Sequence, residues 1–172
     1  FVDLWRLEPA DLRAIPADAK ARKAARRGWP QGRVDGDAPA RIRAHVEAHH
    51  HGRLTLLVHN AGASWRGTFA EGGYPNVQRT MALNFDAVVR VTEALLPLLR
   101  ASAPSALVNV ASTASRVSRP GAGAYSASKF GLRGVSEVLR FDLERHGIKV
   151  SLVCPGGVNT GLVSTVKVAG AD

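Results

Sequence analysis

A tyrosine and a lysine four residues apart could carry acid–base chemistry. Tyr125 and Lys129 fall in a stretch whose apolar residues have helical spacing, so both side chains project from one face of the expected helix. A lysine ammonium close to a phenol stabilises the phenolate and lowers a pKa that is ordinarily about 10. The tyrosine then becomes a usable acid or base near neutral pH. Because such a pair also occurs by chance, the alternative is a surface tyrosine over an aliphatic lysine stem.

Small polar residues follow three short apolar runs, and these runs predict strands that are buried on both faces. The runs span residues 54–59, 106–110 and 149–153. The residues that follow them are Asn60-Ala61-Gly62, Ser112 and Pro155-Gly156. Asn and Gly are ordinary turn formers when taken singly. Together these segments predict a ligand site, because open α/β sheets bind ligands at the carboxyl ends of their strands.

Helices are expected between these strands. Apolar residues at helical spacing predict helices at 77–100 and 125–146, and a shorter helix runs from the cap Asp37 to the stop at Gly52. The alternation of strands and helices predicts an α/β fold with a mostly parallel sheet covered by helices. In this sheet the three strands are expected to be parallel neighbours joined by right-handed crossovers.

Five sequence elements between residues 53 and 160 resemble the short-chain dehydrogenase/reductase family. They are His59-Asn60-Ala61-Gly62, Asn84, Ser112, the Tyr125-x-x-x-Lys129 pair and Pro155-Gly156. The family has Asn-Asn-Ala-Gly in place of the first element and Pro-Gly in place of the last. Asn84 lies 24 residues after Asn60 and 28 before Ser112, where the family has its catalytic asparagine. The resemblance implies a Rossmann-like, doubly wound, three-layer fold that is incomplete in this chain.

The resemblance also implies an oxidoreductase that uses NAD or NADP to interconvert a small-molecule alcohol and a carbonyl by hydride transfer. Tyr125 would exchange a proton with the substrate oxygen, and Ser112 would hydrogen-bond the same oxygen as charge develops. Lys129 would stabilise the phenolate and bind the nicotinamide ribose. Asn84 would hold a water that links the lysine to solvent as a proton relay.

A set of cofactor contacts follows from the same resemblance. Its members are Asn60, Ala61, Gly62, Tyr125, Lys129, Pro155, Gly156 and Thr160. Asn60 would steady the sheet, and Thr160 would bond the nicotinamide carboxamide. Ala61 and Gly62 would let the backbone pass close to the adenosine side of the cofactor, where a residue larger than Gly62 would intrude.

The front of the chain departs from the family's pattern. The family opens with a strand and the turn Thr-Gly-x-x-x-Gly-x-Gly, which receives the pyrophosphate, and this sequence contains no such turn. Residues 1–36 are therefore interpreted as an atypical N-terminal segment, and residues 37–172 as the catalytic region. The Phe1 start favours a partial sequence of a longer enzyme. The alternative is a naturally shortened, non-catalytic homologue that acts as a structural or assembly subunit.

Length and composition fit one globular domain. The formal charge of +9 on 172 residues is spread along the chain, which indicates a solvated surface and no nucleic-acid partner. No apolar run approaches the ~20 residues that span a bilayer, so no membrane partner is expected. Cys154 is the single cysteine, which excludes an internal disulfide framework and a multi-cysteine zinc site. A cytoplasmic location is expected from the lack of targeting signals and disulfides.

Several polar residues outside these elements allow two interpretations. His59 replaces an asparagine of the family motif and is interpreted as a packed or hydrogen-bonded histidine at a strand end, with a catalytic role as the alternative. The consecutive histidines at 49–51 point in different directions, so no metal site is expected. Arg116 and Arg119 lie between the candidate serine and tyrosine. They could meet an acidic substrate or could be solvated surface arginines.

Self-association is expected from the two long helices. Apolar residues lie on more than one side of them, among them Val89, Val91, Phe130 and Phe141. In the family these helices pack against their copies as a four-helix bundle, which implies a homodimer or homotetramer. The alternative is that these residues belong only to the core between helices and sheet.

Overall fold

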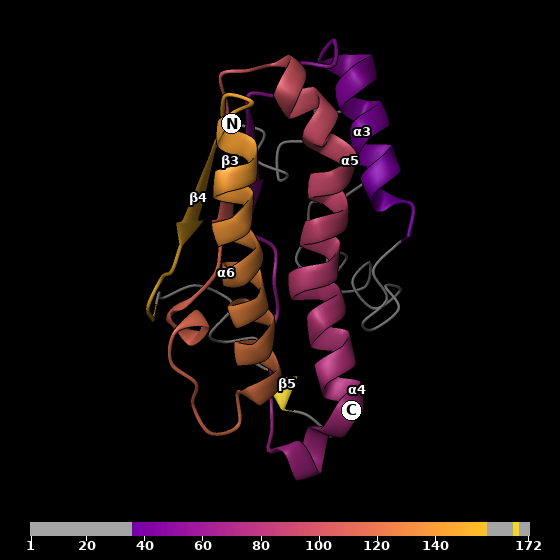
Figure 1. Cartoon of the computed structure of the whole chain (residues 1–172). Helices are drawn as coiled ribbons and strands as arrows, with labels where there is room; N and C mark the ends of the chain where they lie inside the picture. The colour runs from indigo at the N-terminus through magenta and orange to yellow at the C-terminus, as the bar shows by residue number, and fades with distance from the viewer. Residues whose placement is uncertain (1–35, 158–166, 169–172) are drawn as a thin grey trace.

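Three parallel strands form the main sheet of the computed structural model, which describes residues 36–157 and 167–168 (Figure 1). In spatial order they are β1 (Leu56–His59), β3 (Ser105–Val110) and β4 (Ile148–Val153). Both strand pairs are parallel, with Leu57 beside Leu107 and Leu107 beside Val150. The expectation that the three apolar runs are parallel neighbours is therefore confirmed.

Helices connect the strands, as the alternating pattern predicts. The helical elements are α3 (Ala38–His49), α4 (Phe69–Met81), the π-helical η1 (Ala82–Asp86), α5 (Ala87–Ala101), the short 3-10 helix η2 (Thr113–Ser115) and α6 (Gly123–Glu144). Two further strands of two residues each, β2 (Trp65–Arg66) and β5 (Lys167–Val168), pair in parallel apart from the main sheet. The sequence pattern did not indicate this second pair.

A separate helical turn precedes the run predicted at 77–100. It begins at Phe69, and a kink at Gly73, whose φ of 49° and ψ of −155° are not helical, separates it from the rest of α4. Thr68 precedes it as the N-cap, and its hydroxyl accepts a hydrogen bond from the Glu71 backbone N–H at 3.3 Å. The Glu71 carboxylate in turn accepts from the Thr68 backbone N–H at 2.7 Å. This reciprocal capping box supplies partners to two amides that the first helical turn leaves free. It therefore sets the start of the first turn, which the kink at Gly73 separates from the predicted run.

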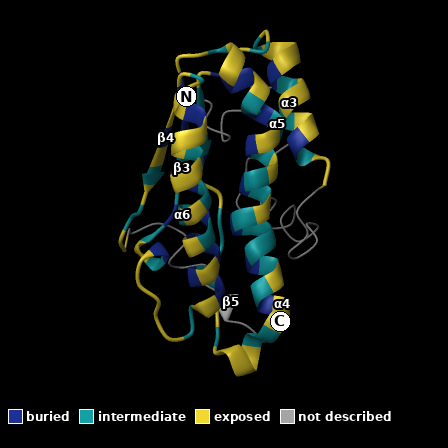
Figure 2. Cartoon of the chain, viewed as in Figure 1, coloured by how far each residue is buried: buried dark blue, intermediate teal, exposed yellow. Residues whose placement is uncertain are grey.

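The core lies between the sheet and one layer of helices. Its buried residues are Val46 of α3, Leu95, Leu98 and Leu99 of α5, Leu143 of α6, and Leu54, Leu57, Leu107, Ile148 and Val150 in and beside the strands. Burial alternates along β3, and on the other face of β4 Lys149 and Ser151 are exposed. Within the described residues the helices cover only one face, so the sheet is an incomplete version of the doubly wound arrangement. Figure 2 shows the outward side of α6 exposed over much of its length.

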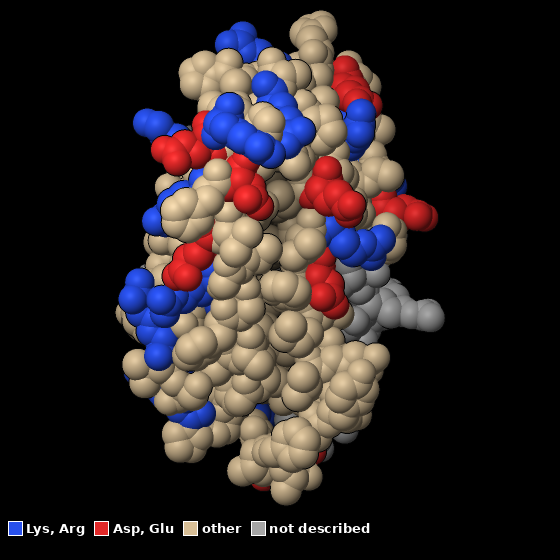
Figure 3. All heavy atoms as spheres, in the orientation of Figure 1, with Lys and Arg blue, Asp and Glu red and all other residues tan. Residues whose placement is uncertain are grey.

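Charged side chains of both signs are mixed on the face formed by the helices (Figure 3). The lower part of this face, over α4 and the first turns of α6, is largely uncharged in the same view. Phe69 and Tyr74 of α4 and Phe130 of α6 are exposed large hydrophobic residues. None of the described helices is long and apolar enough to cross a membrane.

Candidate active site

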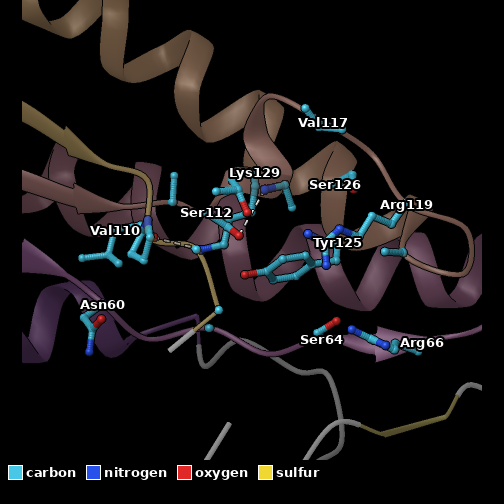
Figure 4. A pocket seen from close by; sticks show the side chains of 18 residues that line it. Asn60, Ser64, Arg66, Val110, Ser112, Val117, Arg119, Tyr125, Ser126 and Lys129 are labelled. Atoms are coloured by element: carbon cyan, nitrogen blue, oxygen red, sulfur yellow. Dashed lines mark hydrogen bonds between the residues drawn. The ribbon is translucent and has the colours of Figure 1, made fainter. Parts of the chain in front are cut away.

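A cavity of about 470 Å³ opens at the carboxyl ends of the three main strands. The predicted site residues that line it are Asn60, Gly62, Ser112, Tyr125, Lys129, Pro155 and Gly156 (Figure 4). Polar residues that follow three different strands thus meet at one place, as the strand ends predict. Ala61 is exposed and does not line the cavity, and Asn84 is buried behind it. Thr160 lies outside the described residues.

Tyr125 and Lys129 project from the same face of α6 into this cavity. The lysine side chain is only 4% exposed, and its Nζ donates a hydrogen bond of 2.9 Å to the Val110 carbonyl at the end of β3. The same Nζ lies 5.7 Å from the centroid of the tyrosine ring. Burial disfavours the ammonium and lowers the pKa of Lys129 from 10.5 to about 8. In Figure 4 the hydroxyl end of Tyr125 points toward Ser112 and Lys129.

Ser112 sits where β3 gives way to the short helix η2. Its backbone is extended, and its hydroxyl oxygen accepts a hydrogen bond from the Ala114 N–H at 3.1 Å. The next residue, Thr113, donates its N–H to the Pro155 carbonyl at 2.9 Å, which continues the pairing of β3 and β4 beyond the strands. The serine is half-buried, and its hydroxyl hydrogen stays available to a ligand. These bonds fix Pro155 and Ser112 side by side.

Asn84 joins three parts of the site from within η1. It is fully buried, and its Oδ1 accepts from the Ala63 N–H at 3.0 Å while its Nδ2 donates to the Ala63 carbonyl at 2.9 Å. Nδ2 also donates to Ser128 Oγ at 3.1 Å, and that hydroxyl donates to the Tyr125 carbonyl at 2.7 Å. A π-helical turn at this position is a feature that often marks functional sites. The side chain therefore ties the segment after β1 to the helix that carries the tyrosine.

Gly62 is required by a close approach, although the neighbours are residues of the chain itself. A Cβ at this position would lie 3.2 Å from Asn84 Oδ1 and 3.7 Å from Lys129 Nζ. The first distance is tighter than ordinary van der Waals contact. The close approach to Asn84 is a reason for glycine within the chain itself, beside the expected contact with the cofactor, which stays a prediction. Asn60 is exposed at the cavity edge and makes no side-chain hydrogen bond within the described residues.

His59 is a buried, hydrogen-bonded residue at the end of β1, as one interpretation of the sequence predicted. Its Nε2 lies 2.9 Å from Thr92 Oγ1, and the Thr92 hydroxyl donates to the Val88 carbonyl at 2.8 Å. Because that hydroxyl has one hydrogen, the histidine Nε2 must be the donor in its own bond. Burial lowers the pKa of His59 to about 4, so the ring is neutral at pH 7. No group of three or more potential metal ligands gathers in the part of the chain that is described.

The sequence analysis missed several lining or supporting residues, and three of them bear on the chemistry of the site. Ser128 bridges Asn84 and Tyr125, and Arg66 and Ser126 line the cavity. Ser128 lies three residues after Tyr125, so its place on the inward face of the helix was a usable signal. Nothing comparable pointed to Arg66, because its position depends on the short β2–β5 pairing.

The fold and the site together define a class of enzyme domain. A parallel α/β sheet whose strand ends converge on a tyrosine, a serine and a buried lysine has the ligand position of Rossmann-type domains. The family model described as short chain dehydrogenase matches residues 14–169, and the chain belongs to this family.

Individual relatives agree with this membership. SadH of Mycobacterium tuberculosis, a protein named as an oxidoreductase, is 33% identical over 144 residues, which are 81% of this chain and 52% of SadH. The crystal structure of a short-chain dehydrogenase from Streptomyces avermitilis is 36% identical, with a TM-score of 0.69, and the match covers 74% of this chain and 47% of that one. A short-chain dehydrogenase structure from Escherichia coli CFT073, complexed with NADPH, is 28% identical with a TM-score of 0.71 and coverages of 80% and 57%. The chain thus spans about half the length of the relatives it matches.

Proposed function

We propose that this chain carries the catalytic centre of an NAD- or NADP-dependent oxidoreductase that interconverts an alcohol and a carbonyl. The observation that carries the proposal is the meeting of Ser112, Tyr125 and Lys129 in one cavity at the strand ends. Membership of the short chain dehydrogenase family supports the same reaction class. The E. coli neighbour bound to NADPH supports a nicotinamide cofactor without deciding between NAD and NADP.

The residues at the strand ends fit the nicotinamide end of such a cofactor. Gly156 and Gly157 present bare backbone to the cavity, since a Cβ at either position would meet no atom within 4 Å. Asn60 and Pro155 also line the cavity. The sequence contains no Gly-rich turn for a pyrophosphate, so the pyrophosphate contacts are not assigned to any residue of this chain. When bound, the cofactor gives a hydride to the carbonyl carbon or takes one from the alcohol carbon.

Tyr125 moves the proton in this mechanism. In the reductive direction its hydroxyl gives a proton to the substrate oxygen as the carbonyl becomes an alcohol, which leaves a phenolate. The Ser112 hydroxyl hydrogen donates to the same oxygen and stabilises the negative charge that develops on it. The Lys129 ammonium, 5.7 Å from the ring, stabilises the phenolate until a proton from solvent restores the tyrosine. The reverse sequence oxidises the alcohol.

Asn84 and Ser128 act as positioning residues in this proposal. Their hydrogen bonds join the Ala63 segment to the Tyr125 carbonyl and so fix the first turn of α6 against the end of β1. Lys129 is fixed independently by its bond to the Val110 carbonyl. A tyrosine and a lysine held on one rigid helix keep the proton donor and the charge in a constant relation.

Replacement of Tyr125 by Phe tests the proposal, since it removes the proton but keeps the ring. Turnover of ketone probes such as ethyl levulinate and dihydroxyacetone, followed by nicotinamide absorbance, should fall by about 10²–10⁴-fold. Cofactor affinity, followed by nicotinamide fluorescence, should change little. Tyr74 is the other tyrosine of the chain and is 68% exposed on α4, so Tyr74→Phe is a matched control that should keep full turnover.

Two results would count against this assignment. Near-normal turnover in Tyr125→Phe would show that another group supplies the proton. Cofactor binding without turnover of any carbonyl or alcohol by the natural full-length protein would favour a structural or assembly role instead.

We also propose that the protein forms a homodimer or homotetramer through α6. Phe130, Val138 and Phe141 on this helix are 42%, 57% and 75% exposed. Val91 of α5, by contrast, packs against the main core cluster. Replacement of Phe141 by Glu should reduce the sedimentation coefficient without loss of helical signal. A wild-type protein that sediments as a monomer at micromolar concentration would overturn this proposal.

A further inference from the structure

All charged side chains among the described lining residues of the cavity next to Tyr125 are positive. Arg66, Arg119 and Lys129 line it, and no Asp or Glu is among the described lining residues. Neither arginine forms an ion pair with a carboxylate within the described residues. A cleft lined by one sign of charge concentrates ligands of the opposite sign.

The two arginines come from different elements that are held together. Arg66 ends β2, and Arg119 lies in the loop before α6. The Gly67 N–H, next to Arg66, donates a 3.0 Å hydrogen bond to the Gly121 carbonyl, two residues after Arg119. Gly121 has a φ of +72°, a conformation that side chains other than glycine rarely adopt. The backbone therefore fixes the two guanidinium-bearing segments side by side.

Both arginines lie at the end of the cavity opposite Asn60 (Figure 4). Asn60 belongs to the segment that is expected to contact the cofactor, and Tyr125 lies between Asn60 and the two arginines in the same view. Ser64 lies beside Arg66 in the same view. A positive charge at this end is therefore placed for the substrate and not for the proposed nicotinamide contacts.

A buried hydroxyl without a partner lies in the same cavity. Ser126 is 3% exposed and lines the cavity, and its buried Oγ has no hydrogen-bond partner among the described residues. Buried polar groups nearly always have partners, so this hydroxyl is an exception beside the cavity. Arg116, in the same loop as Arg119, does not line the cavity. Its positive charge adds to that of Arg133, the main cause, in lowering the pKa of Glu137.

We propose that the substrate carries an oxyanion, a carboxylate or a phosphate, that Arg66 and Arg119 bind while its carbonyl meets Tyr125. Guanidinium groups bind such oxyanions through paired, charge-assisted hydrogen bonds. This inference rests on the proposed oxidoreductase function and names the substrate class of that site.

Matched pairs of probes test the inference in the natural full-length protein. Levulinate is compared with ethyl levulinate, and dihydroxyacetone phosphate with dihydroxyacetone, so that each pair differs in its charge. We expect KM to be at least about 10-fold lower for the anionic member of one pair, and that pair identifies the oxyanion as carboxylate or phosphate. Added salt should raise that KM because the arginines are exposed to solvent.

Substitutions of the arginines test whether Arg66 and Arg119 cause the lower KM for the anionic probe. Arg66→Gln and Arg119→Gln should each raise the KM for the preferred anion by about 10-fold relative to the KM for its neutral partner. Arg116→Gln is the matched control, and its KM ratio should equal that of the wild type. A second readout is independent of turnover: succinate or inorganic phosphate should change the fluorescence of Trp65, the neighbour of Arg66, in the wild type and in Arg116→Gln. The change should weaken in Arg119→Gln.

Failure of the inference differs from failure of the proposed function. Equal KM values within both pairs, with normal turnover, would overturn the inference and leave the oxidoreductase intact. No turnover of any of the four probes, together with no cofactor binding, would overturn the proposed function. The succinate and phosphate titrations would then still decide whether the two arginines bind an oxyanion.

Discussion

Lys129 holds a buried positive charge, and its replacement by methionine should stabilise the protein at neutral pH. The side chain is 4% exposed, and burial lowers its pKa from 10.5 to about 8. Methionine keeps an unbranched stem of similar length but carries no charge. The substitution therefore removes the cost of burying an ammonium while it removes a group that we place in the active site.

The magnitude follows from the two pKa values. Between pH 8 and 10.5 the unfolded lysine still binds a proton that the folded lysine has lost, so the stability of the wild type rises with pH across this window. At 1.36 kcal/mol per pKa unit, the charge costs about 3 kcal/mol below pH 8. Methionine cannot donate to the Val110 carbonyl, and the loss of that bond costs about 1 kcal/mol. The free energy of unfolding of Lys129→Met should thus exceed that of the wild type by about 2 kcal/mol at pH 7 and fall short of it by about 1 kcal/mol above pH 10.5.

Urea denaturation of both proteins at intervals from pH 7 to pH 10.5 measures this difference. Groups that titrate identically in the two proteins cancel when their free energies of unfolding are subtracted. Lys149 is exposed on β4, so Lys149→Met is a matched control for the removal of a surface lysine, and its free energy of unfolding should stay within about 0.5 kcal/mol of the wild type at pH 7. A difference for Lys129→Met that stays constant over the same range would refute the reasoning, because it would show that burial does not shift this lysine.

Three further predictions concern supporting residues. As pH falls from 6.5 to 4, the free energy of unfolding of the wild type should fall by about 3 kcal/mol, because His59 binds a proton in the unfolded chain but not when it is buried. In urea denaturation, His59→Asn should show a smaller fall. Gly62→Ala should reduce turnover and cost about 1–3 kcal/mol, because its Cβ would press on Asn84 Oδ1. Ser128→Ala should lower the free energy of unfolding by about 1–3 kcal/mol, because it leaves an Asn84 donor unpaired.

Each of these predictions has a result that contradicts it. An unchanged acid sensitivity in His59→Asn would show that other groups cause the loss. Full turnover in Gly62→Ala would show that Asn84 can move without consequence. If Ser128→Ala unfolds at the same urea concentration as the wild type, the buried link between η1 and α6 contributes no stability.

Much of the site was readable from the sequence because it depends on local spacing. The four-residue interval between Tyr125 and Lys129 places both on one face of any helix. Polar residues directly after apolar strands meet wherever those strands are parallel neighbours, and Ser112 and Pro155 therefore line the same cavity. The start of the first turn of α4 at Phe69, before the kink at Gly73, was also encoded locally, in Thr68 and Glu71, although the sequence analysis did not use that capping signal.

Other features were decided only by tertiary contact. The pKa of Lys129 depends on its burial, and the position of its side chain depends on the Val110 carbonyl, which lies 19 residues earlier in the chain. Arg66 reaches the cavity through the pairing of β2 with a strand about a hundred residues later, and Arg119 joins it through the Gly67–Gly121 hydrogen bond.

The periodicity of this sequence thus determined the three main strands, the long helices between them, their parallel pairing and the residue types at the strand ends. They could not determine which charges are desolvated, which hydroxyls stay unpaired or which arginines share a cavity. The physical reason is that helix and strand periods report neighbours a few residues apart. Burial, pKa and charge clustering depend on which distant segments exclude water from a side chain.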